Sequence, residues 1–183
     1  MDTSRTAIKT LKNDGLIVMA ADTLYGILGR AHPKKAVQKI YSLKGRDSDK
    51  PFIILISKLS DLRAFGIALS DTQELFLKNV WPGKVSVILP CPGKKFSYLH
   101  RGTESLAFRL IGPRYRTLHS ILKATGPLVA PSANPQGLPP AETAAEAKRY
   151  FGTAIDAYLA GPRRRGKPSR IVSLLGPEAR IIR

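Results

Sequence analysis

The sequence contains little cysteine, little acid and no long apolar run, and each shortage excludes a class of protein. A single cysteine, Cys91, cannot form an intramolecular disulfide. It fits a reducing compartment, so we expect a cytoplasmic protein. No apolar run reaches the roughly 18 residues that a membrane-spanning helix needs, and the polar N-terminus is not expected to be a signal peptide. The three histidines, His32, His100 and His119, lack the spacing of metal ligands, so we assign no metal site.

Several familiar catalytic signatures are also missing. The sequence has no recognisable nucleophile triad, no paired carboxylates, no Walker lysine loop and no G-x-G-x-x-G fingerprint. If the protein is an enzyme, these absences indicate that it works by positioning anions and not through a covalent nucleophile.

Positive charge, in contrast, is abundant and unevenly distributed. Thirty Lys and Arg residues oppose 13 Asp and Glu residues, which gives a formal net charge of +17. Glu104 is the only acid between Glu74 and Glu142, and a second basic cluster, RRRGK, covers residues 163–167. Such an excess predicts a polyanionic partner, either a nucleotide, a nucleic acid or both. A basic proteome or a solubility device is the alternative explanation.

Apolar periodicity and turn residues predict alternating helices and strands. We expect helices over residues 4–14, 32–45, 70–83, 113–126 and 141–152. We expect strands over residues 16–20, 51–57, 84–90, 105–110, 127–133, 154–161, 169–175 and 179–183. This alternation predicts one α/β domain over residues 1–183, built on a twisted, open, mixed sheet flanked by helices. The late strands without helices between them predict some antiparallel pairing.

The segment IYSLKGRDSDKPF, residues 40–52, gathers three cations where a helix should end and a strand begin. Lys44, Arg46 and Lys50 fall within seven residues. The junction between a helix and a strand is a common anion site in α/β proteins. Stabilisation of the helix dipole explains Lys44 equally well, but it explains Arg46 and Lys50 poorly, because both follow the terminating glycine.

Three further places have a possible binding role and a plainer alternative. Ser132 and Asn134, in the turn-rich segment 130–140, could cradle a phosphate or a ribose, although ordinary turn chemistry also explains them. Arg109, near the end of an apolar strand, is costly to bury unless it is paired, so it could bind a substrate carboxylate or, alternatively, extend to the strand end. Ser169 precedes a strand, and it is either a site hydroxyl or a loop residue without a role.

Taken in order, these segments resemble a known family. DTLYG, KIYSLKGRDSDKPFIILI, WPGKVSVILP, SLAFRL, PLVAPSANPQGLPP and GKPSRIV are similar to segments of the YrdC/TsaC-type threonylcarbamoyl-AMP synthases, in their short single-domain form. The resemblance implies that L-threonine, bicarbonate and ATP give threonylcarbamoyl-adenylate and pyrophosphate, with Mg²⁺ assisting. It also implies a YrdC-like sheet with a basic concave face. The product would then feed threonylcarbamoyladenosine modification of tRNA by a separate transferase.

The resemblance also assigns residues to roles. Lys44 and Arg46 would be catalytic. The ATP side would comprise Lys44, Arg46, Ser48, Ser105, Ser132, Asn134, Pro140 and Arg183, to which charge and proximity add Lys50. The threonine side would comprise Ala21, Thr23, Arg109, Ala130 and Ser169.

The sequence departs from the family pattern mainly on the amino-acid side. Ala20 and Ala21 stand where the family usually has Pro-Thr, and Leu55 stands where some members have histidine. Arg170 and Ser173 replace residues that are often Thr and Asp. The phosphate side therefore matches the family more closely than the amino-acid side does. Two alternatives stay open: a non-catalytic RNA-binding module, and a paralogue that adenylates another carbamate or carboxylate.

Overall fold

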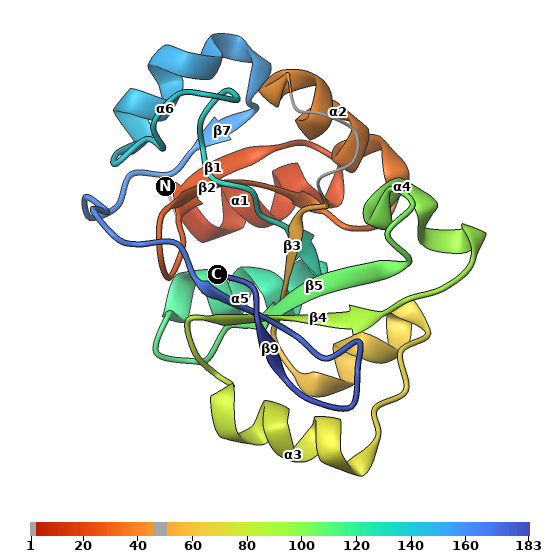
Figure 1. Ribbon diagram of the computed structural model, residues 1–183. Coiled ribbons are helices and arrows are strands. Elements are labelled where there is room, and N and C mark those ends of the chain that lie inside the picture. Colours follow the sequence, from red (N-terminus) through yellow and green to blue (C-terminus); the bar gives the residue numbers. More distant parts are fainter. Residues whose placement is uncertain (1–2, 46–50) are drawn as a thin grey trace.

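A nine-stranded mixed sheet forms the centre of the molecule in the computed structural model, which describes residues 3–45 and 51–183 (Figure 1). The strands lie in the order β7-β1-β2-β6-β3-β5-β4-β8-β9. Their bounds are Ile17–Ala20 (β1), Tyr25–Arg30 (β2), Ile53–Ile56 (β3), Val85–Pro90 (β4), Ser105–Leu110 (β5), Leu128–Val129 (β6), Ala157–Tyr158 (β7), Arg170–Ser173 (β8) and Arg180–Ile181 (β9). Parallel and antiparallel pairs both occur, and β8 pairs with β9 antiparallel, which confirms the predicted mixed sheet.

Helices cover both faces of this sheet. Their bounds are Thr3–Lys12 (α1), Lys34–Lys44 (α2), Asp71–Val80 (α3), Ser97–His100 (α4), Arg116–Thr125 (α5) and Ala144–Phe151 (α6). Helices α1 and α5 pack together on one face, over a core of buried aliphatic side chains (Figure 1). Helices α2, α3, α4 and α6 bury residues in the larger core on the other face. Short 3₁₀ turns cover Leu59–Phe65, Lys94–Phe96 and Gly152–Ala154.

Local signals explain where the helices begin and end. Ser70 caps α3 by accepting a hydrogen bond from the Gln73 backbone N–H at 3.3 Å. Gly45 ends α2 in the left-handed conformation, with φ of 56°. A side chain would be strained at this φ, so the glycine stop predicted from the sequence has a physical basis. It also fixes the point at which the chain leaves Lys44.

Strand β2 was not predicted. Its sequence, YGILGR, contains two glycines, which weaken the usual strand signal. The structure explains one of them, because a Cβ at Gly29 would lie 2.7 Å from a methyl carbon of Leu16 and 3.2 Å from the Cβ of Ala36. The glycine lets this strand and α2 approach closely. Tertiary packing therefore overrides local propensity at this position.

The described helices are also too short or too polar to cross a membrane.

Candidate active site

A pocket of about 210 Å³ collects side chains from segments that are far apart in the sequence. The turn after β1, the residues at the start of β3, the segment after β6 and the residues before β8 all contribute to its wall. Most of the predicted site residues line it, namely Ala21, Thr23, Arg109, Ala130, Ser132, Pro140, Ser169 and Arg183. The structure therefore brings together residues that the sequence analysis assigned to both the threonine side and the ATP side.

Arg109 is the most buried charged residue in the pocket wall formed by the described residues. It lies on the same face of the sheet as its parallel-register neighbour Leu55, and only 4% of the residue is exposed. Its Nη2 lies 2.9 Å from Oδ1 of Asp22, whose side chain is 2% exposed. The contact is an ion pair and not a well-aligned hydrogen bond, since Asp22 Oδ1 accepts no hydrogen bond of good geometry from the described residues. Within the protein, the buried charge of Arg109 is thus paired with Asp22. Contact between Arg109 and a substrate carboxylate stays a prediction.

The guanidinium of Arg109 keeps donor capacity beyond this pair. Its buried Nε has no hydrogen-bond partner among the described residues. Burial lowers the pKa of Arg109, and the Asp22 carboxylate acts in the opposite direction. An arginine stays charged in proteins. Arg109 lines the pocket, and a buried cation with donor capacity in a pocket wall is a strong site for an anionic oxygen.

Two serines extend this network beyond Arg109. Arg109 Nη1 donates to Ser86 Oγ over a long 3.4 Å, and Ser86 Oγ lies 3.0 Å from Ser169 Oγ. Arg183 Nη2 donates to the backbone carbonyl of Ser169 at 3.4 Å. The sequence analysis missed both Asp22 and Ser86. No sequence signal marks Ser86, because a serine between Val85 and Val87 is typical of the polar, outward position of an alternating strand.

Lys44 lies beside the pocket and organises its rim. Only 4% of the residue is exposed. Its Nζ lies 2.7 Å from the carbonyl oxygen of Ser132, 2.5 Å from that of Asn134 and 3.3 Å from Asn134 Oδ1. In this structure, Lys44 therefore holds the turn that follows β6. Contact between Lys44 and the phosphates of ATP stays a prediction.

Asn134 shapes the same turn. Its Oδ1 accepts a hydrogen bond from Ser132 Oγ at 2.7 Å, and its Nδ2 donates to the carbonyl of Leu138 at 2.6 Å and to that of Pro135 at 3.1 Å. This is the turn chemistry that the sequence allowed as an alternative. It is compatible with a ligand above the turn, because the side chain fixes the backbone on which a phosphate or ribose would rest.

The remaining residues predicted for the ATP side lie away from this pocket or outside the described chain. Ser105 begins β5, on the same face as Arg109 and four residues before it. That spacing corresponds to about 13 Å along a strand. Ser105 Oγ donates to Thr103 Oγ1 at 3.3 Å. The other three residues, Arg46, Ser48 and Lys50, lie outside the described residues.

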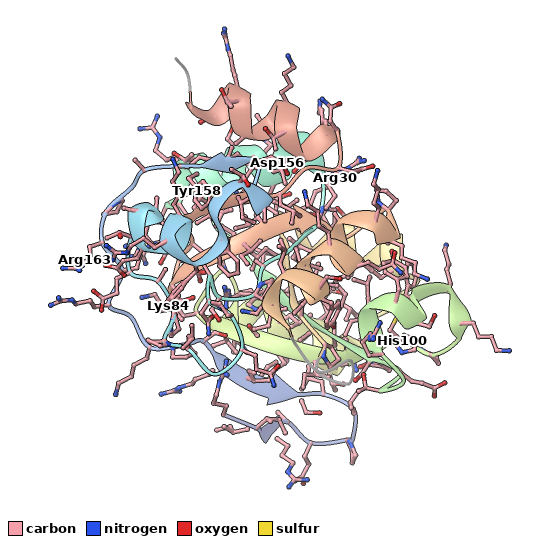
Figure 2. The ribbon with its side chains drawn as sticks, turned by 90° about the horizontal axis from the view of Figure 1, so that it is seen from above. Arg30, Lys84, His100, Asp156, Tyr158 and Arg163 are labelled. Carbon is pink, nitrogen blue, oxygen red and sulfur yellow. The ribbon has the colours of Figure 1, made fainter. Side chains whose placement is uncertain are left out.

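The basic segment 163–167 folds against α6. Arg163 contacts Glu142 at 2.9 Å and Glu146 at 3.1 Å, and Arg165 contacts Glu142 at 3.0 Å. Figure 2 shows Arg163 at the rim of the molecule beside α6. A Cβ at Gly166 would lie 2.5 Å from the carbonyl oxygen of Thr23, so the segment presses directly on the turn that lines the pocket. We refer to residues 161–168 as the strap.

Most of the departures from the family pattern lie away from the pocket. Leu55 is fully buried in the core beneath α1 and α5. Arg170 is exposed, and neither it nor Ser173 is part of the pocket wall formed by the described residues. Ala21, which is 5% exposed, does line the pocket. Any change in substrate preference should therefore be sought first at Ala21.

Comparison with known sequences gives a consistent family. The profile of the Sua5/YciO/YrdC family, described as "Telomere recombination", matches residues 9–183. A threonylcarbamoyl-AMP synthase of Cellvibrio japonicus is 32% identical over 171 residues, which cover 92% of this chain and 89% of that protein. A Bacillus subtilis protein of the same name is 32% identical over 157 residues, which cover 85% of this chain but 44% of the longer relative.

Solved structures agree with this comparison. The Sua5 protein of P. abyssi, crystallised as a complex with L-threonine, superposes with a TM-score of 0.89 at 25% identity, covering 98% of this chain and 53% of that one. E. coli YciO superposes with a TM-score of 0.81 at 21% identity, covering 98% of this chain and 87% of the other. At 21% identity, the similarity to YciO supports the fold alone.

Proposed function

This chain belongs to the Sua5/YciO/YrdC family, and from that premise we propose that it is a threonylcarbamoyl-AMP synthase. The observation that carries the proposal is a buried arginine in the pocket wall, Arg109, whose Nε has no hydrogen-bond partner among the described residues. The chain also covers 89% of a Cellvibrio japonicus relative that bears that name. The substrates would be L-threonine, bicarbonate and ATP.

The reaction joins two anions. Bicarbonate and the threonine amine give a carbamate, with loss of water. A carbamate oxygen then attacks the α-phosphorus of ATP, a new P–O bond forms, and the bond to pyrophosphate breaks. Repulsion between the carbamate and the phosphates contributes to the barrier, so fixed cations and N–H donors lower it by positioning and by electrostatic stabilisation.

On the amino-acid side, Arg109 would receive the threonine carboxylate. Asp22 neutralises one positive charge, and Arg109 and Arg183 supply two, so the three groups carry a net charge of +1. That charge complements one carboxylate. Ala21 and Ala130 would form the wall beside the ligand, and Thr23 would contribute from the turn after β1.

On the nucleotide side, we propose that the phosphates lie over the turn held by Lys44, with Ser132 and Pro140 in contact. Arg46, Ser48 and Lys50 follow Lys44 directly in the chain and would supply further cations and a hydroxyl. Asn134 would keep its role within the turn. Ser105 lies on the same sheet face as Arg109, at a distance that suits a nucleotide extending away from the threonine.

Mg²⁺ would arrive with ATP. The described residues include no group of three or more His, Cys, Asp or Glu side chains able to hold a metal ion. Mg²⁺ in nucleotide sites is commonly bound through the substrate phosphates and water, which needs few protein ligands. We therefore assign it to the substrate complex.

The product would serve tRNA modification through a separate transferase, in the cytoplasm. The net charge of +17 supports contact with tRNA or another RNA. This contact is an addition to the synthase activity and not a requirement for it.

The direct test is pyrophosphate release by the purified protein with ATP and Mg²⁺. We expect release to require both L-threonine and bicarbonate. Release that neither compound stimulates would refute the synthase assignment. Release that needs bicarbonate and an amino acid other than threonine would instead indicate a paralogue with another substrate.

A further inference from the structure

The sheet register places three polar side chains in a row across neighbouring strands. Strand β4 pairs antiparallel with β5 through Val87 and Phe108, so the next residues outward, Ser86 and Arg109, face each other. Strand β4 also pairs parallel with β8, where Ser86 is opposite Ile171. Ser169 lies two residues before Ile171, and so on the same face. The polar row follows from the register itself.

This row is almost completely sealed from solvent. Ser86 is 0% exposed, Ser169 is 3% exposed and Arg109 is 4% exposed. Arg109 and Ser169 line the pocket, whereas Ser86 lies behind them and is not part of its wall. Ser86 therefore cannot act by touching a ligand in this pocket. It can act only through its two neighbours.

The available protons determine which group donates in each hydrogen bond of the row. A serine hydroxyl has one proton and two lone pairs, and a guanidinium only donates. Ser86 Oγ accepts from Arg109 Nη1, so its own proton must go elsewhere. Among the described residues, the contact available to it is Ser169 Oγ at 3.0 Å. The reverse direction would leave the Ser86 proton buried without an acceptor, which is unfavourable.

We propose that Ser86 is a positioning residue that turns Ser169 into a hydrogen-bond donor for the ligand. With Ser86 donating to it, the Ser169 hydroxyl has its own proton left to donate, and Ser169 borders the pocket. This series of hydrogen bonds begins at the Arg109 cation, which strengthens each donor after it. The Ser169 hydroxyl, at the end of this series, therefore favours an anionic oxygen and disfavours an ammonium group. That this oxygen belongs to threonine or its carbamate rests on the proposed function.

Three variants separate this role from general stability. Ser86→Ala removes the relay. Ser86→Thr keeps the hydroxyl. Val87→Ala is the matched control, because it truncates the next residue of β4, which is also 0% exposed but packs in the core on the opposite face. It should cost stability without touching the polar row.

We expect Ser86→Ala to raise the KM for L-threonine by about fivefold to thirtyfold, the range of one or two lost hydrogen bonds in a charge-assisted chain. The KM for ATP should change less than about twofold, because the proposed phosphate site lies at the turn held by Lys44, away from the polar row, and loses no hydrogen bond. Ser86→Thr should recover most of the loss. Combining Ser86→Ala with Ser169→Ala should raise the threonine KM by less than the product of the two single fold-increases, because both variants interrupt the same series of hydrogen bonds.

A second measurement does not depend on the substrate. Nitrogen-15 NMR of the Arg109 guanidinium should show slower exchange of the Nη1 protons in the wild type than in Ser86→Ala, with Val87→Ala like the wild type. Equal exchange in all three proteins would overturn the inference. So would a Ser86→Ala enzyme with the same threonine KM as Val87→Ala. If pyrophosphate release by the wild type does not depend on threonine, but Nη1 exchange still differs between the wild type and Ser86→Ala, then the proposed function fails and the positioning role of Ser86 stands.

Discussion

The ion pair between Arg109 and Asp22 allows a stability effect to be separated from a binding effect. We consider Arg109→Met, which replaces the guanidinium with an apolar side chain of similar reach. The Asp22 carboxylate, with a side chain only 2% exposed, then loses the cation that compensates its charge. In a second variant, Arg109→Met is combined with Asp22→Asn, which removes that stranded charge as well.

The magnitude follows from the burial. Breaking a buried ion pair by removing one partner typically costs about 3–5 kcal/mol, whereas replacing both partners is often close to neutral. The side chains here are 5% and 2% exposed, so solvent can compensate little of the loss. Arg109→Met should therefore lower the free energy of unfolding by about 3–5 kcal/mol, and adding Asp22→Asn should recover about 2 kcal/mol or more of that loss.

Ligand binding should behave differently. A hydrogen bond to a charged group contributes about 1.5–3 kcal/mol, which corresponds to an affinity change of about tenfold to 150-fold. Both variants lack the guanidinium, so both should lose this much affinity for L-threonine, although one of them is the more stable protein. Urea denaturation would measure the stability, and isothermal titration calorimetry would measure threonine binding.

Two results would refute this reasoning. If Arg109→Met binds L-threonine within about threefold of the wild type, then Arg109 does not hold the carboxylate, because even one neutral hydrogen bond is usually worth more. If the stability losses of Arg109→Met and Asp22→Asn simply add in the double variant, then the two side chains do not stabilise each other.

Three further predictions concern other parts of the molecule. Ala21→Thr should lower the threonine KM by about twofold to twelvefold through one added hydrogen bond, and the ATP KM should not change. Thermal unfolding would detect overpacking, and an unchanged threonine KM in a normally folded variant would favour a different substrate. Burial, with nearby cations, lowers the pKa of His32, so the free energy of unfolding should fall as pH drops below about 6.5, by at most about 1.4 kcal/mol per pH unit. His32→Phe should flatten this slope in denaturation measured from pH 7 to 5, and an unchanged slope would contradict the assignment. Glu142→Gln removes the contacts to Arg163 and Arg165, so trypsin should cut the strap faster while global stability changes by less than about 1 kcal/mol, and an unchanged cleavage rate would show that these pairs do not hold it.

Most of the fold could be predicted from local signals. The glycine after α2 and the serine before α3 act where the sequence places them, because capping depends on a few adjacent residues. Strand β2 could not be predicted in the same way. Its Gly29 is needed for close packing against Leu16 and Ala36, and those contacts exist only after folding. Sequence periodicity does not reveal such a requirement.

The site was predictable as a set of residues but not as a network. Arg109 and Ser169 could be selected from their strand positions and from the family resemblance. Asp22 and Ser86 could not, because their roles depend on which strands become neighbours, and the order β5-β4-β8 is not sequential. Lys44 shows the same limit, since its contacts to the turn at Ser132 depend on how distant segments meet.

The central claim is that the protein makes an adenylate from a carbamate of threonine. The most direct measurement is mass spectrometry of the nucleotide product after incubation with ATP, Mg²⁺, L-threonine and ¹³C-bicarbonate. We predict an adenylate that carries both the threonine and one ¹³C atom, and that disappears when either compound is omitted. An adenylate without the label, or no adenylate from an enzyme that still releases pyrophosphate, would contradict the claim.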